Sequence, residues 1–133
     1  MLLITSRETQ RWVLPKGGIM PGMTPSESAA AEAFEEAGIA GAVDRRCIGI
    51  YGYAKARIEG SAYCTVKVYP MKVTTQFADW PERRERQRKW MTFDAASARV
   101  RERALKKILT AFTVSRRNRR PVRSTAISDG SDE

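Results

Sequence analysis

The sequence predicts a single α+β domain in which a mixed β-sheet carries helices on its faces. Three observations predict it: the chain has 133 residues, its expected elements run strands, helix, strands, helix, and no apolar run reaches the roughly 20 residues of a membrane span. The opening Met-Leu-Leu-Ile lacks the features of a signal peptide, so we expect a cytoplasmic protein. We place the domain at residues 1–115 and a flexible tail at 116–133.

Strands are expected on both sides of the first helix. Residues 1–5 and 11–14 have strand composition and precede a loop at 15–18, which is rich in proline and glycine. Residues 43–54 and 62–75 are rich in β-branched and aromatic types, which predicts two longer strands joined by a loop.

The first helix is predicted from its end signals. Thr24 is a candidate N-cap, Pro25 fits the first helical position, and Glu27 closes a Thr-x-x-Glu capping box. Gly38 stands where a C-terminal cap belongs. These signals predict a helix over residues 25–37.

The C-terminal half predicts a loop, a strand, a helix and a tail. An exposed loop at 77–86 leads to a strand at 89–93, after which Asp94 can cap a helix over 95–115. The sequence from Arg116 onward is first basic and then small, polar and acidic, which is typical of a disordered tail.

The composition limits the chemistry that the chain can perform. There is no histidine, and the two cysteines, Cys47 and Cys64, lack a metal-binding spacing. These facts exclude a zinc site and a histidine-based triad, so any metal must be held by oxygen ligands.

The charges are separated along the chain. The formal net charge is +9, residues 82–123 hold fifteen Lys or Arg against four acids, and residues 17–43 hold four glutamates and no basic residue. A strongly basic half favours an anionic partner, which charge alone cannot identify as a phosphorylated small molecule, nucleic acid or membrane surface.

Three glutamates of the first helix are expected to share one face. Glu32, Glu35 and Glu36 stand at i, i+3 and i+4, in the last turns, where the helix dipole disfavours anions. A hard divalent cation such as Mg²⁺ would relieve their repulsion. A solvated acidic face balanced by distant arginines explains the spacing equally well, and the unfavourable dipole position tilts the interpretation toward metal.

The stretch 14–39 resembles the Nudix box, which runs glycine, five residues, glutamate, seven residues, then Arg-Glu-apolar-x-Glu-Glu-x-Gly-apolar. Met23 stands where that motif has its first glutamate and Ala31 where it has arginine, so both members of a supporting ion pair are replaced together. The resemblance implies a repacked support with the metal ligands retained. The matching positions are Gly17, Glu32, Ala33, Glu35, Glu36, Gly38 and Ile39.

The resemblance extends over about residues 2–112. Segments 80–82, 86–90 and 93–96 look like those of the diphosphoinositol polyphosphate phosphohydrolase branch. An α/β/α Nudix fold is implied, and its first strand is expected to be missing, because family members usually begin one strand before the strand at Met1.

The resemblance also implies roles for individual residues. Glu32 and Glu36 are the expected ligands of Mg²⁺, with Mn²⁺ as an alternative ion. Glu35 is the first candidate for activating water or, as the alternative, for an outer-shell ligand, and Glu82 and Glu85 are the next candidates for the base. The expected substrate-binding residues are Lys16, Gly17, Gly18, Arg86 and Arg88.

These roles describe a Nudix pyrophosphohydrolase that cleaves a phosphoanhydride bond, with diphosphoinositol polyphosphate as the best guess for the substrate. A nucleoside diphosphate derivative, such as a dinucleoside polyphosphate or ADP-ribose, is the alternative substrate. A catalytically impaired ligand-binding module is a second alternative, and a nucleic-acid-binding protein is the least favoured. No membrane partner is expected, and a homodimer is an alternative to a monomer.

Overall fold

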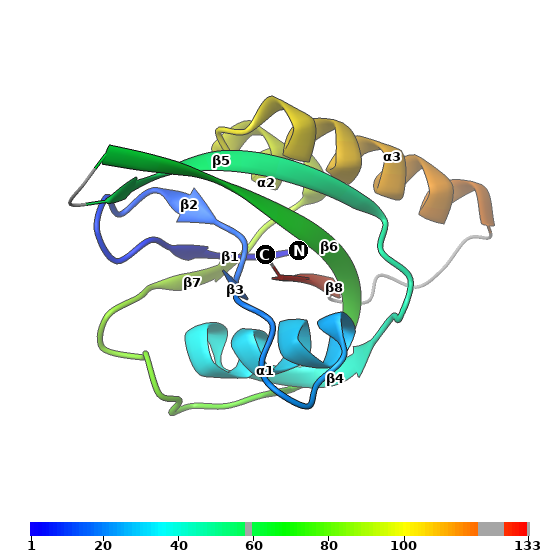
Figure 1. Ribbon diagram of the computed structural model, residues 1–133. Helices are drawn as coiled ribbons and strands as arrows, with labels where there is room; N and C mark the ends of the chain where they lie inside the picture. Colours follow the sequence, from blue (N-terminus) through cyan, green and yellow to red (C-terminus); the bar gives the residue numbers. More distant parts are fainter. Residues whose placement is uncertain (58–59, 120–126, 133) are drawn as a thin grey trace.

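The computed structural model describes residues 1–57, 60–119 and 127–132. It is an α+β fold in layers, with one helix on one side of the strands and two helices on the other (Figure 1). The fold class expected from the sequence is confirmed.

A three-stranded antiparallel sheet brings the N-terminus beside the segment that follows the long loop, which spans residues 77–87. Its strands are β2 (Trp12–Val13), β1 (Leu2–Thr5) and β7 (Arg88–Trp90), in that order. Ile4 lies opposite both Val13 and Arg88. Strand pairing therefore joins residues that are 84 to 88 positions apart in the sequence.

A second sheet contains five strands and is mixed. β3 (Lys16–Gly17), β8 (Ile127–Asp132), β6 (Gly60–Gln76) and β4 (Ile39–Val43) follow one another, and β5 (Gly49–Arg57) pairs with β6. The pairing of β3 with β8 is parallel, whereas the other pairs are antiparallel.

Helix α1 (Pro25–Ala37) has the predicted bounds. The Thr24 side chain accepts a hydrogen bond from the Glu27 amide, and the Glu27 carboxylate accepts one from the Thr24 amide. At the other end Gly38 adopts φ 67°, a left-handed conformation that glycine tolerates without a steric penalty. The capping box and the glycine cap are both confirmed.

Alternate residues of β1 face opposite layers of the core. Leu2 and Ile4 pack with Ala33 and Ala37 of α1, whereas Leu3 packs with Leu105 and Leu109 of the helices on the other side. All seven side chains are fully buried or nearly so. This alternation fixes α1 to one face of the strands, which sets the position of its glutamates.

The predicted C-terminal helix is two helices. α2 (Phe93–Arg99) is capped by the Thr92 side chain rather than by Asp94, and α3 (Arg103–Arg119) follows after a break. Val100 ends α2 in an extended conformation and is buried in the core. Burial of this β-branched side chain is therefore favoured over continuation of the helix.

Two further elements differ from expectation. β4 is a strand of its own, separated from β5, because it pairs with the far half of β6. The flexible tail expected from residue 116 also differs, since α3 continues to Arg119 and Ile127–Asp132 forms β8. Residues 120–126 and 133 of that expected tail lie outside the described residues.

Candidate active site

Glu32, Glu35 and Glu36, at the C-terminal end of α1, differ in burial although they share one side of the helix. Glu36 is 6% exposed, whereas Glu32 and Glu35 are half-buried. A buried carboxyl group requires partners, because burial of an unpaired charge is strongly unfavourable. The neighbours of Glu36 therefore define the site.

Two donors and one acid surround the Glu36 carboxyl group. The Lys16 amide donates a hydrogen bond to its Oε1 at 3.1 Å, and Arg86 Nη2 lies 3.8 Å from its Oε2. Burial, followed by a hydrogen bond with the Glu32 carboxyl group, raises the pKa of Glu36 to about 8, against the lowering effects of Arg86 and the Lys16 amide. The raised pKa of Glu36 favours a form in which one proton lies in its hydrogen bond with the Glu32 carboxyl group.

Gly17 lies directly against the Glu32 carboxyl group. A Cβ atom built on Gly17 would overlap the carboxyl carbon and both of its oxygens, whereas one built on Gly18 meets nothing within 4 Å. The absence of a side chain at Gly17 therefore lets the β3 backbone approach Glu32. The sequence assigned both glycines to substrate binding, which remains a prediction, and the close approach to Glu32 is made by Gly17.

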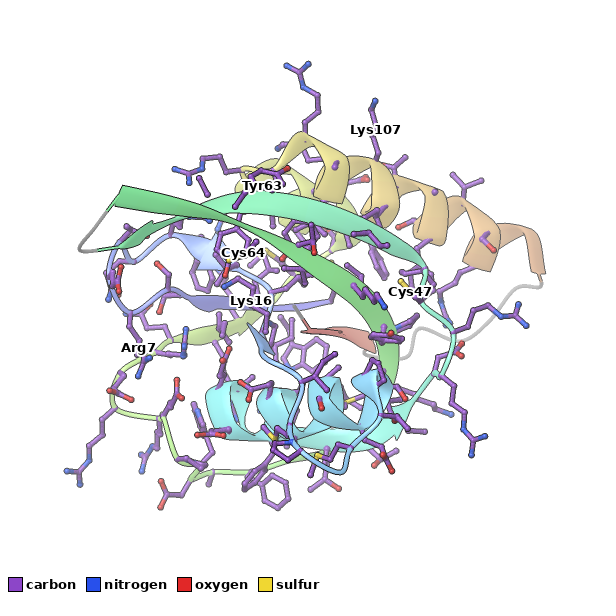
Figure 2. All side chains as sticks on the ribbon, in the orientation of Figure 1. Arg7, Lys16, Cys47, Tyr63, Cys64 and Lys107 are labelled. Carbon is purple, nitrogen blue, oxygen red and sulfur yellow. The ribbon has the colours of Figure 1, made fainter. Side chains whose placement is uncertain are left out.

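Lys16 joins the site through its backbone and directs its side chain elsewhere. Its amide holds Glu36, whereas its Nζ lies 4.3 Å from the centroid of the Tyr53 ring, over the β5–β6 hairpin. Figure 2 shows Lys16 in the space between α1 and that hairpin. The Lys16 backbone therefore contacts the Glu36 carboxyl group, while its side chain reaches the hairpin.

Arg86 is a buried crosslink between the long loop, β1 and α1. Its side chain is only 9% exposed; Nε donates to Glu82 Oε1 at 2.6 Å, and Nη1 donates to the Thr5 carbonyl at 3.1 Å. Together with the Glu36 contact, these interactions engage the guanidinium on several sides. A direct phosphate contact by Arg86 remains a prediction.

Arg88 supports the C-terminus of α1. Its guanidinium donates to the carbonyls of Ala37 at 2.9 Å, Gly38 at 3.2 Å and Phe77 at 2.7 Å, and it stacks on the Trp80 ring at 4.0 Å. The last turn of α1 contains no basic residue, so Arg88 supplies the cation that favours a helix C-terminus. Its expected contact with substrate also remains a prediction.

The two alternative bases occupy different surroundings. The Glu82 amide donates to the Glu35 carbonyl at 3.1 Å, which ties the loop to α1, and the Glu82 carboxylate accepts from Arg86. Glu85 is exposed and lies 3.6 Å from Arg7, which is labelled in Figure 2. Glu35 and Glu82 are therefore linked to α1 and to Arg86 by hydrogen bonds, whereas the described ion pair of Glu85 is with Arg7.

Comparison with known families decides the ancestry of this site. Residues 1–112 match the NUDIX domain. The chain belongs to the Nudix family.

Several Nudix proteins resemble the chain at about one third identity. It is 32% identical over 127 residues to Nudix hydrolase 12, mitochondrial, of Arabidopsis thaliana, covering 90% of this chain and 63% of that protein. It is 34% identical over 110 residues to Nudix hydrolase 17, mitochondrial, of the same plant, covering 82% and 58%. It is 32% identical over 98 residues to diphosphoinositol polyphosphate phosphohydrolase 3-beta of Homo sapiens, covering 72% and 56%. The chain thus spans about three fifths of the length of these relatives.

The carboxyl pair of this Nudix domain fits a divalent metal. Glu32 and Glu36 lie close enough to share a proton, and Mg²⁺ is usually bound through one or two carboxylates, with water and substrate oxygens completing its shell. Within residues 1–57, 60–119 and 127–132, no group of three acidic, histidine or cysteine side chains forms a complete protein cage. The donors therefore suit an ion shared with a phosphorylated ligand.

Two residues of the Nudix site escape sequence reasoning about charge. The Thr5 carbonyl receives Arg86, and the Trp80 indole donates to the Glu36 carbonyl at 3.1 Å. A backbone acceptor leaves no signal in the sequence. Trp80 does stand beside the basic loop, which was a usable signal for a contact with the site.

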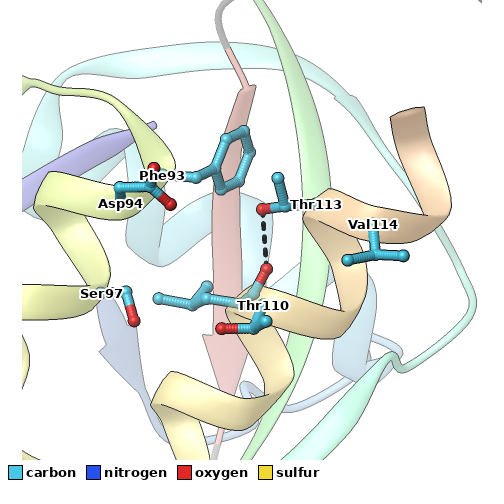
Figure 3. Close-up of a pocket in the computed structure, with 7 residues that line it drawn as sticks. Phe93, Asp94, Ser97, Thr110, Thr113 and Val114 are labelled. Carbon is cyan, nitrogen blue, oxygen red and sulfur yellow. Dashed lines mark hydrogen bonds between the residues drawn. The ribbon is translucent and has the colours of Figure 1, made fainter.

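A small pocket lies far from these carboxylates, between α2 and α3. Figure 3 shows Phe93, Asp94, Ser97, Thr110, Thr113 and Val114 around it, with the Thr113 hydroxyl donating to the Leu109 carbonyl. Its lining contains one acid and no basic side chain, so it does not suit a phosphorylated ligand.

Across the described helices, none is long and apolar enough to cross a membrane.

Proposed function

We propose that this Nudix domain is a Mg²⁺-dependent pyrophosphohydrolase, with Mn²⁺ as an alternative ion, that cleaves a phosphoanhydride bond in a highly anionic small molecule. The observation that carries the proposal is the Glu32–Glu36 pair, whose carboxyl groups are hydrogen-bonded to each other beside Gly17 and the Lys16 amide. Two acids packed so closely are stabilised more by a divalent cation than by one proton, because the cation permits both to ionise.

The residues divide into metal ligands, base and substrate contacts. Glu32 and Glu36 would hold Mg²⁺, which would neutralise charge on the diphosphate oxygens. Lys16 supplies a cation for a phosphate, and Gly17 and Gly18 allow the phosphate to approach the backbone. Arg86 and Arg88 act mainly through the groups that they hold, since their donors are directed at Glu82, Thr5 and the end of α1.

Glu35 is the favoured base in this proposal. It follows Glu32 by three positions on α1 and is half-buried, as a proton acceptor beside the ligands should be. Glu82 is the second candidate, but its carboxylate already accepts the short bond from Arg86. Glu85 is the third, because its contact with Arg7 lies on the exposed part of the loop.

Diphosphoinositol polyphosphate is the proposed substrate. Support comes from the net charge of +9, which attracts a compact polyanion, and from the similarity to a human protein named for that activity. The names of the two plant relatives state no substrate, so nucleoside diphosphate derivatives stay as the alternative.

Cellular location belongs to the proposal as well. We expect a cytoplasmic protein, while two of the relatives are named mitochondrial. Fractionation of cells that express the tagged natural protein separates the two locations.

Product analysis tests the proposed reaction. The purified protein is incubated with Mg²⁺ and a panel of diphosphoinositol polyphosphates, dinucleoside polyphosphates and ADP-ribose, beside Glu36→Gln and the exposed control Glu8→Gln; released inorganic phosphate reports turnover of the first class, and chromatography of the nucleotide products reports turnover of the other two. We expect Glu36→Gln to lower turnover at least about 100-fold, because it removes a metal ligand, and Glu8→Gln to retain it. Tight Mg²⁺-dependent binding without product on any substrate would instead indicate the ligand-binding module.

A further inference from the structure

The C-terminal strand β8 occupies a central position in the second sheet. It runs parallel to β3, with Ser131 opposite Lys16 and Asp132 opposite Gly17, and antiparallel to β6, from Lys72 opposite Ile127 to Lys67 opposite Asp132. Within the described part of the chain, β8 is the only strand that pairs with β3. It therefore connects β3 to the rest of the sheet.

On the side away from β8, strand β3 contacts the candidate active site. β3 carries the Lys16 amide, which donates to Glu36, and Gly17, which packs on Glu32. Helix α1 lies against both β3 and β8 (Figure 1). The two-residue strand β3 is thus held between the carboxyl pair on one side and β8 on the other.

The sequence of β8 is unusual for a central strand. ISDGSD contains one β-branched residue, a glycine and two aspartates, which are poor strand formers, and it lacks apolar alternation. Its attachment must therefore depend on the backbone ladder with β3 and β6. Such recognition by main-chain hydrogen bonds is how added strands bind to sheet edges.

We infer that Ile127–Asp132 is a removable strand that assembles the Nudix site by holding Lys16 and Gly17 in place. When it leaves, β3 loses its strand partner, residues 67–72 of β6 lose one of theirs, and the contacts of Lys16 and Gly17 with the glutamates loosen. Its effect on order in the site is independent of the reaction, whereas its effect on turnover rests on the proposed function.

A proline in the ladder tests the inference in the full chain. Ser131→Pro removes the main-chain N–H opposite Lys16 and Val68, and proline is excluded from central strands; the matched Ser131→Ala keeps the N–H. We expect amide hydrogen exchange over residues 14–20 and 64–72 to accelerate at least about tenfold in the proline variant and to stay unchanged in the alanine variant.

A peptide in trans provides the second arm. A synthetic peptide of residues 125–133 is added to the Ser131→Pro protein, beside the same peptide with proline at 131. Restored protection with the natural peptide alone supports the inference, including the case in which the variant is largely unfolded and the peptide restores its far-ultraviolet circular dichroism. Equal exchange in the wild type and the proline variant, or no effect of the natural peptide, overturns it.

Turnover separates this inference from the proposed function. Loss and rescue of exchange protection without turnover on any substrate would leave the strand role standing and remove the hydrolase. Full turnover in Ser131→Pro with unchanged exchange would remove the strand role and leave the hydrolase.

Discussion

The Arg86 guanidinium lies 3.8 Å from the Glu36 carboxylate, and both side chains are less than a tenth exposed. The pair links the long loop to the last turn of α1, and Arg86 also reaches Glu82 and the Thr5 carbonyl. Arg86 therefore supplies a buried positive charge beside a candidate metal ligand. Such a pair is expected to act on both stability and metal binding.

Arg86→Gln is expected to lower the free energy of unfolding by about 2 kcal/mol, because it leaves Glu82, Glu36 and the Thr5 carbonyl with unsatisfied buried oxygens. Urea denaturation, with the exposed Arg84→Gln as the matched control, measures the difference. Equal stability of the two variants would show that Arg86 is free to bind substrate, as the sequence first suggested.

The pH dependence of stability without divalent metal follows from Glu36. Its pKa is raised to about 8 in the folded protein from 4.5, so the folded state holds a proton that the unfolded state releases. This contribution to stability is fully present below pH 4.5 and is lost as pH rises through about 8. We expect the free energy of unfolding in EDTA to fall across this window in the wild type and to be flatter in Glu36→Gln.

Added Mg²⁺ should reverse that trend. The ion requires an ionised Glu36, so its binding displaces the shared proton and its apparent affinity rises from pH 6 to pH 8. Titration calorimetry in two buffers of different ionisation enthalpy counts the released proton. No proton release at pH 6 would contradict Glu36 as a ligand.

The glutamate face could be predicted from sequence because every signal that sets it is local. Thr24, Glu27 and Gly38 fix the ends of α1, and helical periodicity then places the carboxylates. The Arg86 contact with Thr5 joins residues 81 positions apart through the pairing of β1 with β7, and no local pattern encodes such a contact. β8 was also not predicted, because its polar sequence favours disorder and its pairing depends on backbone hydrogen bonds.

Gly17→Ala tests the close approach of β3 to Glu32. The added methyl group would overlap the Glu32 carboxyl group, which must then move away from Glu36, whereas Gly18→Ala enters open space. We expect Gly17→Ala to weaken Mn²⁺ binding at least about tenfold, as measured by electron paramagnetic resonance, and Gly18→Ala to leave it within about twofold. Similar binding in the two variants would argue that Glu32 is not held by this contact.

Arg88→Gln distinguishes support of α1 from contact with substrate. Loss of three carbonyl contacts and of the stacking on Trp80 is expected to lower the free energy of unfolding by about 1–2 kcal/mol, because the end of α1 loses its nearby cation. Arg83→Gln is the matched control, since Arg83 is exposed and reaches only Asp79 at 3.7 Å among its described ion pairs. Thermal and urea unfolding give the stability, and the KM for the hydrolysed substrate gives the second readout. A KM that rises tenfold in Arg88→Gln with unchanged stability would return Arg88 to the phosphate-binding role, whereas lost stability with an unchanged KM places it beneath the site, holding the turn that carries Glu35 and Glu36.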